Sequence, residues 1–422
     1  MTSLQTYEPK SKDVIGDFEM RTEANHRRQM RGELAEEISR IDNEMFKDAS
    51  RVCPKCGGAM YAHGHSNPTS YFASCGEVRI RLHRLRCTAC KHIEVPGYTL
   101  IPDDGISAGL GEKMCDLASK MPYAKANDSL SIQHGIHIST KRYWKFVQKE
   151  AAVVGDIIAQ EACALYEDGV EPDTVNLAGD KPLIIGIDGG HIRGWKTNPS
   201  FEVKCATIAT GSEKVSGKRR KLTDRIGYAA ECSVEDFRKR VSTLAIKSGY
   251  LTASERIFVS DGAYWISKMI ADWFPDAIHV LDMYHLKHKV QGLFGLTAAG
   301  EDAVLRDEAL SACDCYEPSL IIELIASWQP RDAGKATAQD ELVMYIGNNA
   351  DAIRNHRLVF IHGSGWIEKG VDLMISRRLK NRGMSWTTNG CSHMLPFAVL
   401  RYNRQWGVYW NKRKGLQLDA AS

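Results

Sequence analysis

The chain has 422 residues, a length that exceeds one ordinary domain and predicts two or three. Its 43% hydrophobic and 25% charged residues are typical of a soluble globular protein, and the lack of any run of about eighteen apolar residues excludes a membrane-spanning helix. The net charge of +3 does not by itself indicate a nucleic-acid partner, and the first residues lack the basic patch and apolar core of a secretory signal.

Residues 1–50 are predicted to form a polar helical leader, because apolar residues recur at helical spacing between Glu33 and Ile41. The composition changes at residue 51, after which Gly, Cys and His become frequent. Short stretches then alternate between apolar and basic residues, as in Val78–Leu82. This alternation predicts β-ribbons over residues 51–105.

Two Cys-x-x-Cys pairs lie in this β-rich segment: Cys53 with Cys56, and Cys87 with Cys90. A pair at this spacing can occupy two corners of a zinc tetrahedron from one tight turn. Two such pairs separated by strands therefore predict a zinc ribbon over residues 51–105. Because four thiolates leave no open coordination position, we expect a structural Zn²⁺ and not a catalytic one.

Residues 106–175 are predicted to be helical. One helix runs from Tyr123 towards Gly135, and a second begins near Lys141 and Arg142, with Ser139 or Thr140 as its N-cap. Helix, short turn with Gly, then a helix with basic residues in its first turn is the helix-turn-helix arrangement of DNA-binding proteins. An ordinary helical hairpin in a linker domain is the alternative.

From residue 180 the pattern changes to alternating strands and helices. Apolar runs predict strands at residues 183–188, 201–210, 225–230, 256–261 and 277–282. Amphipathic patterns predict helices at 234–248, 264–274 and 283–293, and residues 214–223 are predicted to be a basic hairpin loop.

The resulting order, β-β-β-α-β-α-β-α, is that of the ribonuclease-H-like fold. It predicts an α/β catalytic core over residues 180–299 and 359–395. A helical insertion over residues 300–358 is expected to interrupt this core, and residues 396–422 are expected to form a basic C-terminal tail.

Asp188 and Asp261 each follow an apolar run and precede glycine, so both are predicted to lie where a strand ends. Ligands of open α/β sheets gather beyond the carboxyl ends of strands. Two-ion phosphoryl transfer needs at least three acids, and carboxylates suit Mg²⁺ or Mn²⁺. The third acid is predicted to be Glu368, in the first turn of a helix preceded by Gly-Ser-Gly. Asp372, one turn later on the same face, is the alternative.

Four blocks of sequence, in order, then carry a resemblance: Ile187–Gly190, Val259–Trp265, Leu281–Leu286 and Gly363–Glu368. They are similar to blocks of the DDE transposases of bacterial insertion sequences. The closest resemblance is to the Mutator-related group, which carries an Asp/Cys-x-x-His motif after the second acid. The basic stretch Arg378–Trp386, with its Gly-Met-x-Trp ending, also resembles that group. The resemblance extends from Cys53 to Trp410.

This resemblance implies that Asp188, Asp261 and Glu368 hold two Mg²⁺ or Mn²⁺ ions and catalyse DNA strand cleavage at transposon ends, followed by strand transfer to target DNA. His285, in the motif Asp282-x-x-His285, would position the scissile phosphate or transfer a proton. A hydrogen-bonded Asp282–His285 pair that braces the strand end is the alternative.

A DNA partner gives a role to basic clusters that are otherwise solvated helix faces. We expect transposon ends and target DNA to be bound by Arg79, Arg81, Arg84, Arg86, Lys141, Arg142, Lys218, Arg219, Arg220, Arg377, Arg378, Lys380 and Arg382. The expected assembly is a homodimer or higher oligomer on DNA, in the bacterial cytoplasm at the nucleoid. Two rival functions are a ribonuclease-H-like nuclease that only hydrolyses, and a catalytically silent zinc-ribbon DNA-binding protein derived from a transposase.

Overall fold

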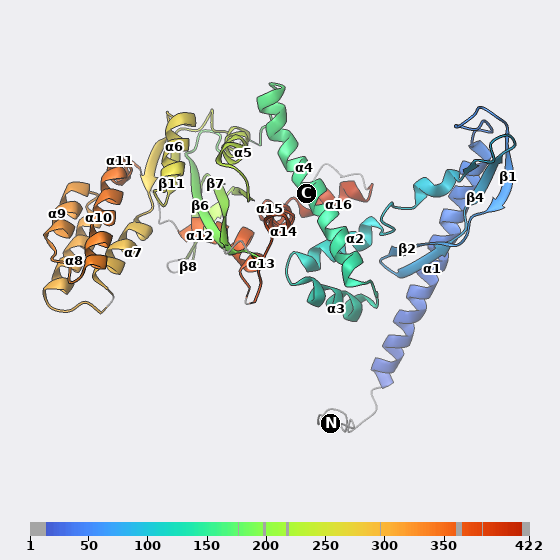
Figure 1. Ribbon diagram of the computed structural model, residues 1–422, viewed down its shortest axis with the longest axis horizontal. Helices are drawn as coiled ribbons and strands as arrows, with labels where there is room; N and C mark the ends of the chain where they lie inside the picture. Colours follow the sequence, from blue (N-terminus) through green and yellow to red (C-terminus); the bar gives the residue numbers. More distant parts are fainter. Residues whose placement is uncertain are drawn as a thin grey trace. The chain divides into compact units, whose positions relative to one another are not determined.

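The computed structural model describes residues 14–175, 177–196, 200–216, 219–295, 297–359, 365–381 and 383–415. The chain divides into two compact units, residues 1–147 with 408–422 and residues 148–407 (Figure 1). Within the described ranges, no helix is both long enough and apolar enough to cross a membrane.

The first unit begins with a long helix, α1 (Val14–Asp48), followed by short strands. Strands β1 (Met60–His65), β4 (His83–Cys87) and β5 (Ile93–Glu94) form one antiparallel sheet, whereas β2 (Thr69–Ala73) and β3 (Gly76–Ile80) form a separate hairpin. The short helix η2 (Pro96–Leu100) follows β5. The predicted β-ribbons are therefore confirmed.

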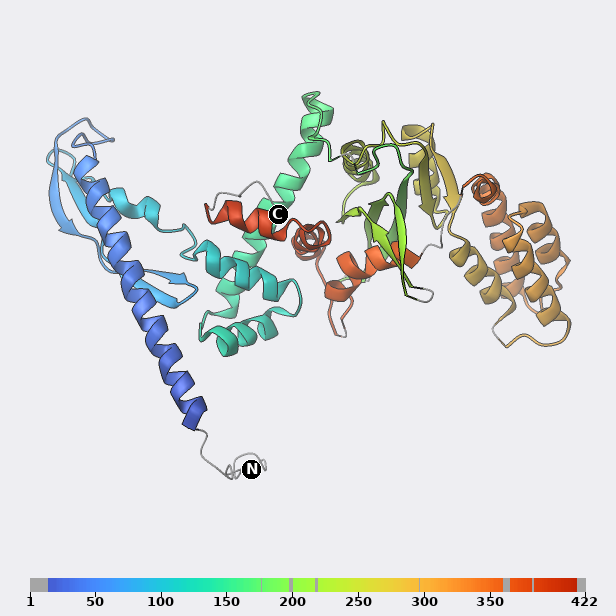
Figure 2. The ribbon, with the colours of Figure 1, turned by 180° about the vertical axis from the view of Figure 1, so that it is seen from behind.

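Helix α1 is more than the predicted polar leader, because it forms part of the core of this unit. It packs against β3, β4 and η2, as Figure 2 shows from behind. Ala35 and Ile38 of α1 contact the buried side chains of the β2–β3 hairpin. The buried Asp42 carboxylate accepts a hydrogen bond of 2.9 Å from the backbone N–H of His83 and so ties the helix to β4.

Three helices follow the strands: α2 (Ala108–Ala118), α3 (Tyr123–His134) and α4 (Thr140–Glu167). Gly135, with φ of 61°, ends α3 in the left-handed conformation that glycine adopts without strain. The Ser139 hydroxyl accepts from the N–H of Arg142 at 3.3 Å and caps α4. The predicted helix, turn and helix are thus confirmed as secondary structure.

The second unit contains a five-stranded mixed sheet with the order β10-β7-β6-β11-β12. Its strands are β6 (Leu183–Arg193), β7 (Ser200–Ala209), β10 (Ile226–Ala230), β11 (Arg256–Ser260) and β12 (Ile278–Leu281). β7 runs antiparallel to both of its neighbours, β6 and β10. β11 and β12 run parallel to β6.

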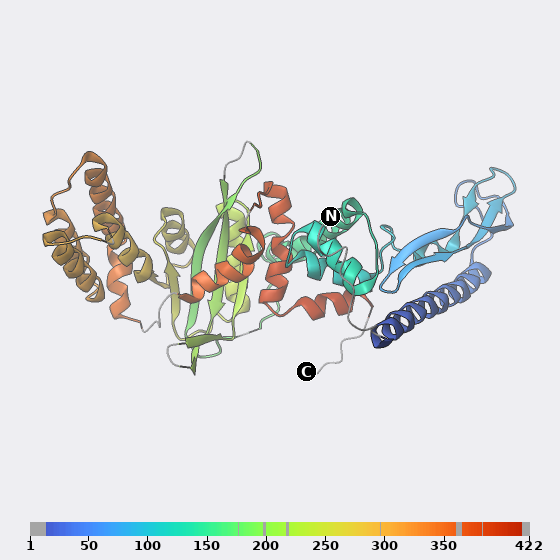
Figure 3. The ribbon, with the colours of Figure 1, turned by 90° about the horizontal axis from the view of Figure 1, so that it is seen from below.

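Helices cover both faces of this sheet. On one face, α5 (Val234–Lys247) and α6 (Tyr264–Trp273) bury Phe237 and Ile266 against Ile185 of β6. On the other face lies α12 (Gly365–Val371), as Figure 3 shows. It continues through a π-helical turn, η4 (Asp372–Ser376), into α13 (Arg377–Leu379). Helices α14 (Thr388–Ser392) and α15 (Leu395–Tyr402) follow, and α16 (Trp406–Arg413) ends the described chain.

The segment predicted to be a helical insertion consists of α8 (Glu301–Asp314), α9 (Pro318–Ser327), α10 (Ala333–Asn348), α11 (Ala350–Arg354) and the short η3 (Asn355–Arg357), so its helical content is confirmed. Together with α7 (Met283–Phe294), these helices form a hydrophobic core of their own, which includes Leu286, Ile321 and Ile346.

Three predicted boundaries differ from the structure. Strand β6 continues past Asp188 to Arg193, because it pairs with β7 over its whole length. The basic segment after β7 is a hairpin of β8 (Gly211–Ser216) and β9 (Arg219–Thr223), not a loop. The expected basic tail folds into α15 and α16, whose Tyr402 and Trp410 are buried, so it belongs to the cores of the two units.

Candidate functional site

Three aspartates follow matching positions on three adjacent parallel strands. Ile187 of β6 is paired with Ser260 of β11, and Ser260 is paired with Leu281 of β12. The next residues along the chain are Asp188, Asp261 and Asp282. Parallel strands in register lie about 4.8 Å apart, so the three residues stand in a row at one level of the sheet.

All three aspartates belong to the face of the sheet that α12 covers. Side chains alternate along a strand, so residues two apart share a face. Ile257 and Val259 of β11 and Val280 of β12 pack with Ile367 of α12. The same alternation assigns Asp261 and Asp282 to that face. On β6, Ile185 and Ile187 belong to the opposite core, so Asp188 also faces α12.

Helix α12 can approach the sheet closely because two glycines lack side chains. A Cβ added to Gly186 of β6 would lie 2.6 Å from side-chain atoms of both Ile367 and Trp366. A Cβ added to Gly370 would lie 2.3 Å from the hydroxyl oxygen of Thr207. This close packing brings Glu368 of α12 to the row of aspartates.

We expect Gly186→Ala to destabilise the second unit by about 1–3 kcal/mol, because the added methyl group overpacks the contact between β6 and α12. Thermal or urea unfolding of the full chain measures this. Gly347→Ala is the matched control, since a Cβ there meets nothing within 4 Å in helix α10. Equal stability of the two variants would contradict the packing described here.

The charges of the site interact strongly. Burial raises the pKa of Asp188 to about 6; the N–H of Gly189 opposes this by donating at 2.7 Å, and the carboxylates of Asp261 and Glu368 add like-charge repulsion. Burial also raises the pKa of Glu368, with Asp282 as the like charge. Asp261 and Glu368, predicted from sequence to share a site with Asp188, thus both lie within electrostatic reach of Asp188.

Glu368 and Asp372 have different surroundings, although they lie one turn apart. The Oε2 atom of Glu368 is buried without a hydrogen-bond partner among the described residues. The Asp372 carboxylate forms ion pairs with Lys369 at 2.6 Å and Arg377 at 3.1 Å, whose hydrogen bonds lower its pKa. Among the described residues, Glu368 therefore has a carboxylate oxygen without a partner, whereas the Asp372 carboxylate is paired with two cations at the surface.

Sequence reasoning did not include Asp282 in the acid cluster. Ligand atoms of Asp282, His285 and Glu368 all lie within 4.8 Å of one another, a group that could hold a metal ion. Like the two predicted aspartates, Asp282 directly follows an apolar run of residues, and this signal was present in the sequence.

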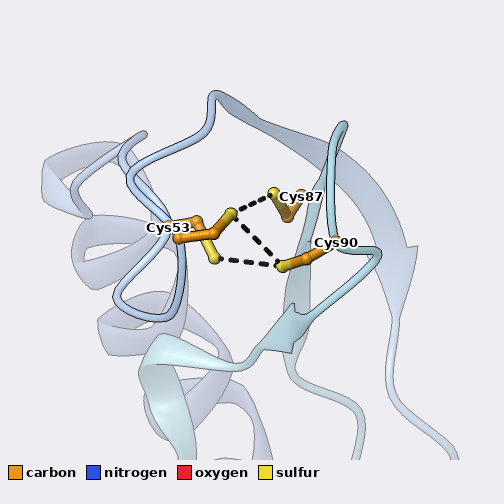
Figure 4. Close-up of side chains that lie close together, drawn as sticks. Cys53, Cys87 and Cys90 are labelled. Carbon is orange, nitrogen blue, oxygen red and sulfur yellow. Dashed lines mark hydrogen bonds between the residues drawn. The ribbon is translucent and has the colours of Figure 1, made fainter.

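The four predicted cysteines converge in the first unit. Cys53 and Cys90 have sulfurs 3.7 Å apart, Cys56 and Cys87 3.5 Å, and Cys56 and Cys90 3.4 Å (Figure 4). Tetrahedral Zn–S bonds of about 2.3 Å place sulfurs roughly 3.8 Å apart, so the spacing suits a metal such as zinc.

The turn of the second cysteine pair favours a thiolate at Cys87, whereas the neighbouring thiols raise the pKa of Cys90 to about 11. Backbone N–H groups of Cys90 and Ala89 donate to the sulfur of Cys87 and lower its pKa to about 6, although burial opposes this. The first pair begins where Cys53 leaves the short bridge between Val52 and Ala59. The four-cysteine group could therefore hold a metal ion without rearrangement of its turns.

A family model matches residues 106–414, which is more than half of the chain. The chain belongs to the uncharacterised protein family UPF0236. The segment shared with UPF0236 contains the four acids and His285, whereas the four cysteines precede it. A search of curated proteins found no match.

Within the UPF0236 segment, the predicted DNA-binding residues have different environments. Lys141 and Lys380 are exposed. Arg142 is half-buried: its guanidinium donates to the carbonyls of Asp104 at 2.8 Å and Gly105 at 3.2 Å. Arg378 is only 5% exposed and its guanidinium lies 4.8 Å from the ring centre of Trp386, so it is not available to a phosphate backbone.

The remaining basic residues also differ in exposure. Arg79 and Arg81 are exposed, whereas Arg84 and Arg86 are partly buried and lie on a different sheet from Arg79. Arg377 is exposed but paired with Asp372. Lys218, Arg382 and the side chains of Arg219 and Arg220 lie outside the described residues.

Proposed function

We propose that this UPF0236 protein is a DDE-type DNA transposase, which cleaves DNA strands at transposon ends and transfers them to target DNA. One observation carries the proposal: Asp188 and Asp261 follow paired positions on neighbouring parallel strands, and Glu368 comes to the same face from α12. Gathering buried like charges is costly unless cations bind between them, so a structural role does not account for the arrangement.

The sheet supports the same proposal. The strands lie in the order β10-β7-β6-β11-β12. If the five strands of this sheet are numbered 1 to 5 in chain order, this is the order 3-2-1-4-5, which is expected for a ribonuclease-H-like core. In this interpretation the helices between Glu301 and Arg354 are an insertion between the second and third acids. The resemblance of the four sequence blocks adds the expectation of transposition, beyond hydrolysis alone.

The residues present fit divalent cations of the Mg²⁺ or Mn²⁺ type. Their donors are carboxylate oxygens, and Glu368 contributes a buried oxygen without a hydrogen-bond partner in the described part of the chain. Asp188, Asp261 and Glu368 would hold two ions. When bound, the pair would supply charge neutralisation at the phosphate and an activated nucleophile.

The fold of the chain would hold the acidic residues of the site in position. The parallel register fixes Asp188 against Asp261, and the glycine contact of Gly186 fixes the distance of α12 from β6. His285, in the first turn of α7, would help to position the phosphate beside these acids. Positioning and charge neutralisation are sufficient to catalyse phosphoryl transfer, so no covalent intermediate on the protein is required.

In the first unit, we propose a zinc ribbon held by Cys53, Cys56, Cys87 and Cys90, and a helix-turn-helix formed by α3 and α4. The exposed residues Lys141 and Lys145 lie one turn apart on α4 and can both reach phosphates. Arg79 and Arg81 add positive charge near the ribbon.

We expect Lys141→Ala with Lys145→Ala to weaken DNA binding and to reduce the salt slope by about one for each phosphate that a lysine no longer neutralises. Arg142→Ala is expected to act differently. It removes two bonds to loop carbonyls and the packing of the guanidinium 4.7 Å from the Phe72 ring centre, so it should destabilise the first unit by about 1–3 kcal/mol.

Fluorescence anisotropy over a salt series, together with thermal unfolding, separates these effects. If the double lysine variant keeps the salt slope of the wild type, α4 is not the DNA-binding helix. If Arg142→Ala lowers the slope without loss of stability, Arg142 contacts phosphate after all.

A cleavage assay tests the proposed function. The substrates are labelled duplexes that tile the DNA flanking the gene on either side, incubated with the full chain and either Mg²⁺ or Mn²⁺. We expect nicking at a fixed position that leaves a 3′-OH. Wild-type protein that nicks none of the duplexes with either metal would contradict the proposal.

A further inference from the structure

A second group of metal-type ligands lies beside Asp188 and Asp261. Asp282 follows β12, His285 stands in the first turn of α7, and Glu368 comes from α12. One ligand atom from each lies within 4.8 Å of the other two. Two segments that are distant in the sequence, the start of α7 and α12, thus place two carboxylates and an imidazole around one point.

One carboxylate oxygen of Asp282 accepts a backbone hydrogen bond, and the other lies near His285. Its side chain is only 4% exposed. Its Oδ1 accepts from the N–H of Tyr284 at 2.9 Å and caps α7. Its Oδ2 lies 3.7 Å from Nε2 of His285, which is too long for a hydrogen bond. Asp282 and His285 therefore do not form the hydrogen-bonded pair that was the alternative role predicted from the sequence.

Glu368 supplies an independent indication of a ligand. Its Oε2 is buried and has no hydrogen-bond partner among the described residues. A buried carboxylate oxygen without a partner costs free energy, unless a proton or a cation satisfies it. The neighbouring Asp282 disfavours a second negative charge, and this repulsion is relieved when a cation lies between the two carboxylates.

We propose that Asp282, His285 and Glu368 form a mixed nitrogen and oxygen site for a divalent transition-metal ion, with Mn²⁺ preferred to Mg²⁺. This inference deepens the proposed function and rests on it for the role of the site. It assigns one of the two ions to Asp282, His285 and Glu368, and leaves Asp188 and Asp261 to the other. An imidazole ligand favours transition metals, whereas Mg²⁺ is bound chiefly through oxygen.

Manganese binding to the full-length, zinc-loaded protein tests this directly. A single equivalent of Zn²⁺ per chain is added to fill the four-cysteine group, whose thiolates suit zinc, so that the mixed nitrogen and oxygen site stays free for Mn²⁺. Titration followed by electron paramagnetic resonance measures affinity, and electron spin echo envelope modulation detects a nitrogen atom bonded to Mn²⁺. We expect nitrogen coupling in the wild type and none in His285→Ala. We also expect a loss of affinity of at least about tenfold in that variant, since even outer-shell changes can cost this much.

His288→Ala is the matched control. His288 is exposed, lies one turn further along the same helix and is not part of the group, so its replacement should leave the nitrogen coupling intact. His285→Asn provides a second variant of similar shape, and circular dichroism confirms that each variant is folded. A wild-type spectrum without nitrogen coupling, or coupling that persists in folded His285→Ala, would overturn the assignment.

The outcomes separate this inference from the proposed function. Nitrogen coupling that depends on His285, in a protein that never cleaves DNA, would support the metal site and contradict the transposase. Metal-dependent cleavage by a protein whose Mn²⁺ shows no nitrogen coupling would support the transposase and contradict this ligand set. Asp188→Asn should retain the nitrogen coupling, because Asp188 is assigned to the other ion.

Discussion

Asp188→Asn is expected to lower the rate of DNA strand cleavage by about 10³-fold or more, with DNA affinity unchanged. Charge stabilisation by a bound ion contributes several kcal/mol to such a reaction, and each 1.36 kcal/mol corresponds to about a tenfold change in rate. Asp261→Asn and Glu368→Gln should have similar effects, because each removes one anionic ligand from the same face of the sheet. The measurement is single-turnover cleavage of a labelled duplex that the wild type nicks.

Asp372→Asn is the control for this series. Asp372 lies one turn after Glu368 but pairs with Lys369 and Arg377 at the surface, so its loss should leave the cleavage rate within a few fold. If Asp372→Asn abolished cleavage while Glu368→Gln did not, the third acid would be misassigned. If Asp188→Asn cleaved as fast as the wild type, the acid row would have no catalytic role.

Removal of the metal proposed for the cysteine group is expected to unfold the strands around it. Structural zinc contributes an apparent binding free energy of about 10–16 kcal/mol at neutral pH, which exceeds the stability of most domains. Cys56→Ser should therefore reduce the zinc content of the purified chain from one ion towards none. It should also abolish DNA binding through the first unit. Elemental analysis measures the zinc content, hydrogen exchange measures the unfolding of the strands, and fluorescence anisotropy measures DNA binding.

Cys163→Ser is the matched control, because Cys163 is exposed, belongs to the second unit and is not one of the four clustered cysteines. It should keep the zinc content of the wild type. Purified wild-type protein that contains no zinc, and whose strands exchange no faster after treatment with a chelator, would rule out a structural metal at this place.

The sequence was most informative where chemistry depends on local spacing. The cysteine pairs stand two residues apart, so each turn could be predicted without knowledge of the fold, and the structure brings all four sulfurs together. Asp188 and Asp261 were recognisable because each follows an apolar run of residues and precedes a glycine. The helix that carries Glu368 was recognisable from the glycines before it.

Features that depend on pairing between distant segments could not be predicted. β6 continues past Asp188 because β7 supplies hydrogen bonds to it as far as Arg193, and nothing local to β6 records this. Arg378 looks like an exposed cation in sequence, yet it is buried beside Trp386. The level of Asp282 relative to Asp261 likewise depends on the register of β11 with β12.

Strand transfer is the reaction that distinguishes a transposase from a nuclease. A labelled duplex from the DNA at one end of the gene, precut to expose its 3′-OH, is incubated with the full chain, Mn²⁺ and supercoiled plasmid. We predict covalent joining of the duplex to the plasmid by the wild type and none by Asp188→Asn. Cleavage of the uncut duplex without any joining of the precut one would contradict the transposase and leave a nuclease that only hydrolyses.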